Sequence, residues 1–475
     1  MFFLFKKLHR PLKAVICGWL VLFLVIGTVR PTFSFTVGEE KEVGEELLAI
    51  VRKEFKVIDD PDVVQYVNRV GGQILHAAGP QFFDYHFFVI DNKEFNAFAA
   101  PSGMIFIHSG LIKTMDSEGE LVSVIAHEVG HAASRHIADR IAKSSKINAG
   151  TAAMALAGIL LGAGPVSEAL IVGSLATGTT MNLKFSRQDE EEADRLAYKY
   201  MKQLGRNPAS MVSMLRKMYR IDRYRQGQVP AYLLTHPQPS MRMGYVQNLV
   251  QMDGAGKYAS EDQFDFRRIK CRILAQSDDS LTLLPVYQRE SVDVELDADR
   301  RMMALYGVSL AQAASADFDA AIKSLKRVIS FYPDKPILQT DLGVIYFAQG
   351  NIEKALAIFK KSFAAAPDCF HTKYYLARTL YRSGKLKEAA ILYEELLVQM
   401  PDNADLHSQL GRIKAELGNL ASGYYHLGVS FWYQGNAEMA KRHLKQAIEL
   451  SKDGGEKKAA KELLKTIARV EKNSK

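Results

Sequence analysis

Two histidines and a glutamate lie close together in the segment His127-Glu128-Val129-Gly130-His131. In a helix, His127 and His131 share one face, so their imidazoles can bind a single zinc ion. Glu128 points to one side of that face and can take a proton from the attacking water without binding the metal. This pattern predicts zinc-dependent amide hydrolysis; the alternative is a helix with two surface histidines. The apolar run 121–126 places the helix in a core, which favours the metal site.

A catalytic zinc ion needs a third protein ligand, and the segment from Ser186 to Asp194 can supply it. We expect this segment to open a helix that runs to Gly205, on which Glu190 and Asp194 share a face. Glu190 can reach the metal, while Asp194 can accept the second N–H of a ligand histidine. Acidic residues are also favoured at a helix N-terminus by the dipole alone, so the two glutamates between them receive no role. His136 is expected to point away from the site.

The elements that must position these residues lie between about Val43 and Val250. Helical periodicity alternates there with short β-branched or aromatic runs, which predicts one α+β domain. Ser117 and Glu120 can form a capping box for a helix that extends to Ile141. A charged stretch from Gly254 to about Arg300 is expected to be a linker with a small β element.

Beyond this stretch the sequence repeats every 34 residues, at Pro333, Pro367 and Pro401 and again at Gly350, Gly384 and Gly418. The period and its small residues resemble the tetratricopeptide repeat, a pair of helices that stacks on its neighbours. The phase jumps by half a repeat after Gly418, and the polar stretch 452–475 is expected to be a capping helix. Such stacks usually present a concave binding face, and the alternative is a purely structural solenoid.

The first 34 residues have basic residues, then an apolar run from Ala14 to Val29, then a small residue at Ser34, which predicts a secretory signal or an uncleaved anchor. They hold five basic residues and no acidic ones, so the formal charge of +8 comes largely from them. The remainder is nearly balanced and gives no electrostatic case for nucleic-acid binding. Only Cys271 and Cys369 remain beyond this segment, too few for a disulfide scaffold.

The metal-site residues resemble a known family. The histidine motif, followed 59 positions later by Glu190-x-x-Ala-Asp194 after a Ser-Arg pair, is similar to the gluzincin metallopeptidases related to the CaaX prenyl proteases and HtpX. Residues 96–107 look like the strand that these enzymes place beside the active site, where an extended substrate adds by backbone pairing. The substrate-strand residues implied by the resemblance are Asn96, Gly103, Met104, Ile105 and Phe106.

The segment Thr235-His236-Pro237 with Arg242 looks like the downstream motif of the secreted branch of this family. The resemblance implies that His236 caps the open position of zinc in a resting state or helps to stabilise the oxyanion. It also implies that Arg242 supports the site. The alternative for Thr-His-Pro is a simple turn.

The whole arrangement is similar to the BepA-type periplasmic proteases. We therefore expect an α+β zincin-like (gluzincin) metalloprotease domain and an all-α repeat solenoid, mainly helical overall, in four parts: 1–34 signal, 35–253 peptidase, 254–300 linker and 301–475 repeats. The resemblance implies one Zn²⁺ per chain, protein substrates, and repeats that engage the outer-membrane assembly machinery or its clients. The alternative function is a chaperone-like assembly factor with a latent protease domain.

The segment 150–180 is rich in Ala, Gly and Leu, and it lies between the two helices that are expected to hold the metal. Glycines and a proline split it into halves that are each too short to span a bilayer. The leading interpretation is a buried hairpin or lid over the cleft. A segment that touches a membrane surface and a transmembrane hairpin are the alternatives.

Overall fold

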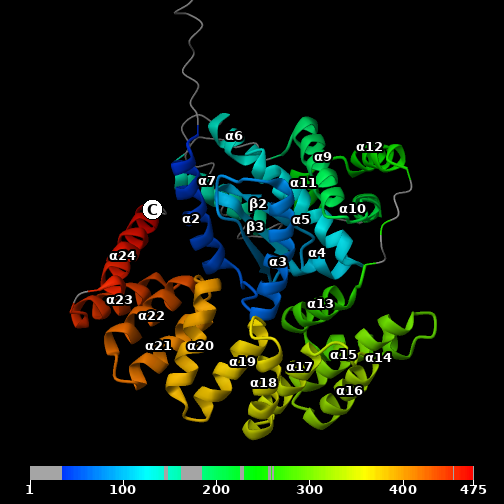
Figure 1. The fold of residues 1–475 in the computed structure, drawn as a ribbon. Coiled ribbons are helices and arrows are strands. Elements are labelled where there is room, and N and C mark those ends of the chain that lie inside the picture. Colours follow the sequence, from blue (N-terminus) through cyan, green and yellow to red (C-terminus); the bar gives the residue numbers. More distant parts are fainter. Residues whose placement is uncertain are drawn as a thin grey trace, which may run out of the picture. The chain divides into compact units, whose positions relative to one another are not determined.

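The computed structural model describes residues 35–143, 148–161, 184–224, 229–254, 258, 261–452 and 454–473. The helices and strands that the structure describes all lie in the unit Val37–Lys475 (Figure 1). The expected signal segment, 1–34, lies outside the described residues. Of the helices that the structure describes, none combines the length and the apolar character needed to cross a bilayer.

A three-stranded sheet with the order β1-β3-β2 forms the centre of the peptidase domain. Strand β1 (His86–Ile90) pairs in parallel with β3 (Met104–His108), and β3 pairs antiparallel with β2 (Ala97–Ala100). A short 3-10 turn, Pro101–Gly103, joins β2 to β3, and Gly103 adopts a φ of +76° there. Strands β2 and β3 are buried along their whole length, so they belong to the core.

Ten helices among the described residues pack around this sheet, which confirms the α+β expectation. They are α2 (Val37–Glu54), α3 (Pro61–Ala78), α4 (Ser109–Thr114), α5 (Glu118–Ala133), α6 (His136–Lys143), α7 (Ala149–Leu161), α9 (Arg187–Gln203), α10 (Ala209–Tyr224), α11 (Ala231–Thr235) and α12 (Pro239–Met252). The core that they share with the sheet includes Phe87, Ile105, Ile107, Ile125 and Val129.

Helix α5 begins at the expected cap, where the Ser117 hydroxyl accepts from the Glu120 N–H. It ends earlier than expected: Arg135 takes a left-handed conformation with φ of +53°, and α6 starts after it. Helix α9 begins with a full capping box between Ser186 and Asp189. The two helices cross closely because Gly130 has no side chain; a Cβ there would lie 3.0 Å from the carbonyl oxygen of Ala193.

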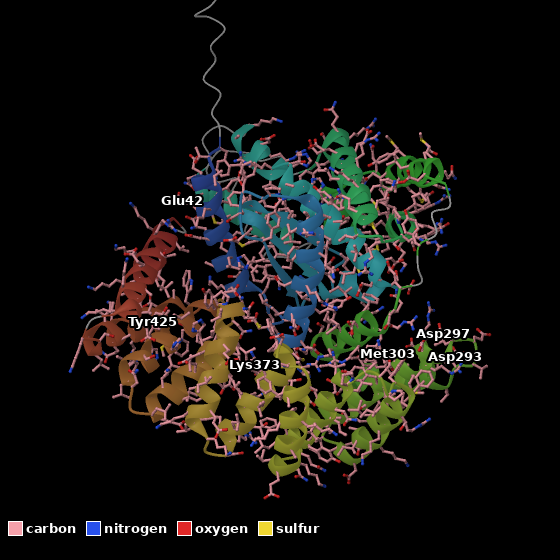
Figure 2. All side chains as sticks on the ribbon, in the orientation of Figure 1. Glu42, Asp293, Asp297, Met303, Lys373 and Tyr425 are labelled. Carbon is pink, nitrogen blue, oxygen red and sulfur yellow. The ribbon has the colours of Figure 1, made fainter. Side chains whose placement is uncertain are left out.

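The stretch 254–300 contains two helices, α13 (Phe264–Ser277) and α14 (Ser280–Val292), and no strand in its described part. The expected small β element was therefore wrong. The apolar residues of α13 repeat with helical spacing and pack on both neighbouring domains, and its cysteine, Cys271, contacts the backbone of Met303 (labelled in Figure 2). Asp279 and Asp297 of this charged stretch are N-caps, of α14 and of the helix that follows it.

The repeats form helix pairs, as the period of 34 residues predicts. They are α15 (Ala298–Ala314), α16 (Phe318–Phe331), α17 (Ile337–Ala348), α18 (Ile352–Ala365), α19 (Phe370–Arg382), α20 (Leu386–Gln399), α21 (Ala404–Glu416), α22 (Leu420–Tyr433), α23 (Ala437–Leu450) and α24 (Gly455–Asn473). Gly350, Gly384, Gly418 and Gly435 all have positive φ, so each ends a helix with a left-handed turn. Helices α21 and α22 each end at such a glycine, Gly418 and Gly435, so the phase jump of half a repeat corresponds to one helix rather than a helix pair.

Helix α3 packs on α19 of the repeats, and two groups of ion pairs also join the repeats to the peptidase domain. In the first, Arg268 and Arg272 of α13 pair with Asp60 and Asp62 at the start of α3 and with Asp341 of α17. All five side chains are largely buried (Figure 1 shows α13 between these helices).

The second group lies at the other end of the array, on α2. Arg52 pairs with Asp59 at 2.7 Å and donates to the Asp402 carbonyl oxygen at 3.3 Å. Arg469 of α24 pairs with Glu45 and lies 3.9 Å from Glu42 (labelled in Figure 2). The repeat array is therefore attached to the peptidase domain at both of its ends.

Candidate active site

Three histidines and a glutamate converge inside the peptidase domain. His127 and His131 project from α5, Glu190 from the first turn of α9, and His236 directly follows α11. All four side chains are buried, and their ligand atoms lie within 4.8 Å of one another. The Nε2 atom of His127 is 3.0 Å from His131 Nε2, 3.3 Å from His236 Nδ1 and 3.6 Å from Glu190 Oε2.

These spacings fit a tetrahedral metal site. Ligand atoms at about 2.0–2.2 Å from one zinc ion would lie roughly 3.3–3.6 Å apart at tetrahedral angles. Imidazole nitrogens and a carboxylate are ligands that zinc prefers, and here they lie within reach of one ion. The residues present therefore fit a metal ion.

Asp194 and Arg242 hold two of these ligands in place. The Nδ1 atom of His127 donates to Asp194 at 2.8 Å, which turns its Nε2 toward the cluster. Arg242 donates to Asp194 through two nitrogens, and its third lies 2.7 Å from Glu190. Burial acts to raise the pKa of both carboxyls, but Arg242 and the neighbouring histidines hold each pKa below its ordinary value. Both carboxylates are therefore ionised at neutral pH.

His131 has a partner that the sequence analysis excluded. Its Nδ1 atom lies 2.8 Å from Nδ1 of His136, so one ring donates to the other. The expectation that His136 points away was wrong because the helix breaks at Arg135, and the turn brings the ring back toward α5. Burial lowers the pKa of His131 and keeps the ring neutral, as a metal ligand requires.

Glu128 is fully buried beside the cluster and has one free oxygen. Its Oε2 accepts from the backbone N–H of Ala99 in β2 at 3.0 Å. Among the residues that the structure describes, its Oε1 has no hydrogen-bond partner, and it lies 3.7 Å from His236 Nε2. The carboxylate is thus fixed by one oxygen while the other faces the space between β2 and the metal ligands.

The strand next to Glu128 is β2, not β3. Strand β3, which holds Met104, Ile105 and Phe106, is paired on both sides and has no edge that a substrate could join. Our expectation for this strand was wrong because pairing order cannot be read from strand composition. Gly103 lies in the turn, and Asn96 immediately precedes β2, which is the edge strand on the active-site side.

The cluster is closed to solvent. His127, Glu128, His131, Glu190, Asp194, His236 and Arg242 are each at most 4% exposed. Phe185 stacks on His131 with ring centroids 4.0 Å apart, and Tyr232 stacks on His236 at 4.3 Å. A backbone hydrogen bond from Phe185 to Thr235 joins these two covering segments.

Helix α7, the described half of the segment 150–180, also lies over the site. Most of its residues are buried, and it packs against α2 and β2. The carbonyl oxygen of Ile159 accepts from the side chain of Asn96, next to the edge strand. The second half of this segment, 162–180, lies outside the described residues.

Sequence reasoning missed four residues of this site: His136, Phe185, Tyr232 and Tyr245. The Tyr245 hydroxyl donates to Asp194. Tyr245 follows Arg242 by three positions on α12, so the shared helix face was a usable signal. The two aromatic residues carry no motif, because their role depends only on where the chain returns in space.

Comparisons with known proteins agree with this site. Residues 61–250 match the model of Peptidase family M48, and residues 312–379, 347–413 and 421–453 match tetratricopeptide repeat models. The chain is 28% identical over 439 residues to the beta-barrel assembly-enhancing protease of Escherichia coli (strain K12), with 87% of each chain covered.

Two further relatives agree. The putative beta-barrel assembly-enhancing protease of Vibrio cholerae is 26% identical over 431 residues, which covers 90% of this chain and 87% of that protein. Metalloprotease LoiP of Escherichia coli is 31% identical over 162 residues, 34% of this chain and 61% of that protein.

The chain is therefore a metalloendopeptidase with a peptidase M48 domain followed by tetratricopeptide repeats. Over most of its length it is a relative of the beta-barrel assembly-enhancing proteases, which confirms the resemblance seen in its sequence.

Proposed function

We propose that this protein is a zinc-dependent endopeptidase of the periplasm that hydrolyses peptide bonds in misassembled or client outer-membrane proteins. The observation that carries the proposal is the buried set His127, His131, Glu190 and His236 with Glu128 beside it. The names of the relatives, beta-barrel assembly-enhancing proteases, support the choice of client. The apolar segment at residues 14–29 supports export.

In the proposed mechanism, His127, His131 and Glu190 would hold the zinc ion, and His236 would be a fourth ligand in the resting state. Zinc, when bound, would polarise the scissile carbonyl and make the attacking water more acidic. Glu128 takes the proton of that water on its free Oε1 and passes it to the leaving amine. Its other oxygen stays bonded to Ala99, which keeps the carboxylate oriented.

The substrate must enter along β2. An extended client segment can pair with the backbone of this edge strand, which carries the N–H that holds Glu128. Entry requires that α7 and His236 move, since both lie against the space between β2 and α5. His236 would thus act as a removable cap, and Arg242 supports the other ligands from α12.

The burial of the whole cluster favours a second function, that of a chaperone-like assembly factor whose protease is latent until a client or partner opens it. The repeats would then bind clients or the outer-membrane assembly machinery. Helix α20 supports such a role because it exposes Ile391 and Val398, two turns apart on one face. For 150–180, burial of α7 favours a lid, and we propose peripheral membrane contact only as the alternative; nucleic acid is not proposed as a partner.

The test compares the wild-type protein with Glu128→Gln, using metal analysis and cleavage of an unfolded outer-membrane β-barrel protein. We expect about one zinc per chain in both proteins, because Glu128 is not a ligand. Cleavage should fall by orders of magnitude in the variant, and a chelator should abolish it in the wild type until zinc is restored. Wild-type protein without metal, or a variant that cleaves at the full rate, would overturn the proposal.

A further inference from the structure

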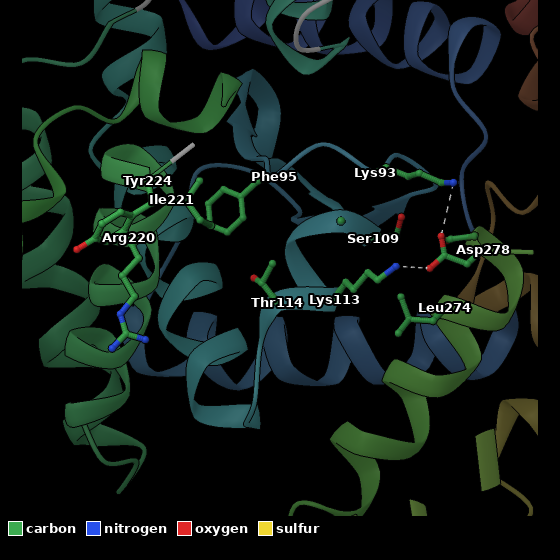
Figure 3. Close-up of a pocket in the computed structure, with 12 residues that line it drawn as sticks. Lys93, Phe95, Ser109, Lys113, Thr114, Arg220, Ile221, Tyr224, Leu274 and Asp278 are labelled. Carbon is green, nitrogen blue, oxygen red and sulfur yellow. Dashed lines mark hydrogen bonds and ion pairs between the residues drawn. The ribbon is translucent and has the colours of Figure 1, made fainter. Parts of the chain in front are cut away.

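A cavity of about 530 Å³ lies away from the catalytic cluster (Figure 3). It is enclosed by the loop before β2, by α4, by the last turns of α10 and by the end of α13. None of the metal-site residues lines it, and the cavities that do touch His127 and His131 measure only about 10–20 Å³. Ligand-binding pockets typically measure about 300–1,000 Å³, so this cavity has the size of a binding site.

The floor of the cavity is apolar. Phe95 and Leu274 are almost fully buried there, and Ile221 adds aliphatic surface from α10. Tyr224 stands at the edge with its side chain largely exposed. Figure 3 shows Phe95 facing Ile221 and Tyr224 across this part of the cavity. The surface can therefore hold an aromatic or aliphatic side chain.

The rim of the cavity is positively charged. Lys93, Lys113 and Arg220 line it, against the single carboxylate of Asp278. Lys113 pairs with Asp278 at 2.7 Å, while Lys93 lies 3.7 Å from it, and both lysines are well exposed. Within the part of the chain that the structure describes, Arg220 has no ion-pair partner. The rim thus keeps about two uncompensated positive charges.

The backbone holds this rim in place. Gly110 of α4 lies directly against the loop, and a Cβ there would be 2.2 Å from the carbonyl oxygen of Lys93. The loop therefore packs closely on the first turn of α4. Lys93 projects from this closely packed backbone, so its side chain starts from a fixed point on the rim.

We propose that this cavity binds a peptide segment in which a carboxylate lies beside an aromatic or aliphatic side chain. The apolar side chain would cover Phe95 and Leu274, and the carboxylate would pair with Lys93 or Arg220. The carboxylate can belong to an acidic side chain or to the end of a polypeptide, since both present the same group.

The cavity lies where a client could use it. Phe95 is two residues before β2, the edge strand beside Glu128. Its ring meets Tyr232 edge-on at 6.1 Å, and Tyr232 in turn stacks on His236. A peptide held here would be anchored at the start of the strand along which we propose that clients enter. The anchoring role rests on the proposed function, whereas the binding itself does not.

The test measures binding to the full chain carrying Glu128→Gln, so that the probes are not cleaved. Two fluorescein-labelled Gly/Ser peptides serve as probes: one has an internal Glu-Phe pair and an amidated C-terminus, and the other ends in Phe with a free carboxylate. Matched peptides carry Gln-Phe or an amidated terminal Phe. Fluorescence anisotropy gives each Kd.

Arg220→Glu and Lys93→Glu are the test variants, and Arg216→Glu is the control. Arg216 is an exposed residue of the same helix as Arg220 and does not line the cavity. All are surface changes, and equal melting temperatures will confirm that they fold. We expect at least one carboxylate probe to bind, with Kd raised about 10-fold or more by either test variant and changed less than about 2-fold by the control.

The two probes distinguish an acidic side chain from a C-terminal carboxylate. Only the probe that matches the natural ligand should show a Kd that rises in the rim variants. The proposal is overturned if neither probe binds below about 1 mM. It is also overturned if the Gln or amide peptides bind equally well, or if both test variants bind like the control. Each result concerns binding alone and leaves the zinc mechanism to its own test.

Discussion

The guanidinium of Arg242 forms two hydrogen bonds with the carboxylate of Asp194, each 2.8 Å long. This pair joins α12 to α9 at the point where Asp194 also orients His127. The metal ligands are therefore supported from α12. Its residue Arg242 lies about fifty positions after Asp194, the last residue of the two motifs that identify the site.

Arg242→Lys should weaken zinc binding although it keeps the charge. Lysine cannot form two parallel bonds to a carboxylate, so Asp194 and Glu190 would lose their fixed positions. We expect zinc affinity to fall about 10 to 100-fold, as when other groups that orient metal ligands are removed. Competition with a zinc-binding dye measures this, and Arg195→Lys on the exposed face of α9 is the control. An unchanged affinity would show that Arg242 acts only in folding.

His236→Ala should retain zinc and cleave short peptides faster than the wild type. His127, His131 and Glu190 remain as ligands, and the coordination position that His236 would take becomes free for water and substrate. Metal content and the cleavage rate of an unstructured peptide are the measurements. His76→Ala, a change on α3, should alter neither. Complete loss of zinc would mean that His236 is an essential ligand rather than a removable cap.

His136→Phe should lower zinc affinity by about 10 to 100-fold, because it keeps an aromatic ring but removes the partner of His131 Nδ1. His136→Gln offers a polar group at the same place and should recover part of the loss. Zinc affinity is the readout, since a purely structural role would affect melting temperature alone. Equal affinities for the phenylalanine variant and the wild type would contradict this role.

Asp341→Ala should loosen the repeats from the peptidase domain. Asp341 pairs with Arg268 and Arg272 in a buried site, and breaking a buried pair typically costs about 3–5 kcal/mol. We expect a lower melting temperature and faster limited proteolysis near α13, with metal content unchanged. Asp334→Ala, at an exposed turn of the same array, is the control. Proteolysis at the wild-type rate would show that the other attachment is sufficient.

His108 should make the fold sensitive to acid. Burial lowers the pKa of His108 from 6.5 to about 3. The unfolded chain therefore binds a proton that the folded chain does not, and stability falls as the pH drops below 6.5. Between pH 7.5 and 5 this group alone accounts for about 2 kcal/mol.

His108→Phe removes that titration and should reduce the loss of urea stability between these two pH values. His86→Gln, at an exposed position, should leave the loss unchanged. If the phenylalanine variant is as acid-sensitive as the wild type, the buried imidazole is not the cause.

The sequence was most informative where all the residues of a motif lie on the same helix. The spacing of His127 and His131, and of Glu190 and Asp194, requires only helical geometry, and the structure brings these residues together. The repeats were equally readable, since Gly350, Gly384 and Gly418, which end helices, recur with the period.

The remaining features of the fold and the site depend on how separate helices and strands pack against one another. Strands β2 and β3 have similar apolar compositions, and only the fold decides which becomes the edge. His136 contacts His131 because Arg135 breaks the helix, and no propensity of that segment predicts a left-handed residue there. The charged stretch before the repeats proved to be helical, because its apolar residues follow helical spacing, and acidic residues such as Asp279 cap its helices.

The attachment of the repeats at both ends of the array limits how the molecule can open. A body joined to another at one hinge can rotate freely about it, whereas a body joined at two separated points can turn only about the line between them. The contacts of Arg268 with Asp341 and of Arg469 with Glu45 are two such points. Any swing of the whole array other than a rotation about that line must therefore break one of them, while a shift of α7 or of the segment that carries His236 breaks neither. Access to the metal ligands should accordingly begin as a small displacement within the peptidase domain, with the repeats acting as a fixed frame.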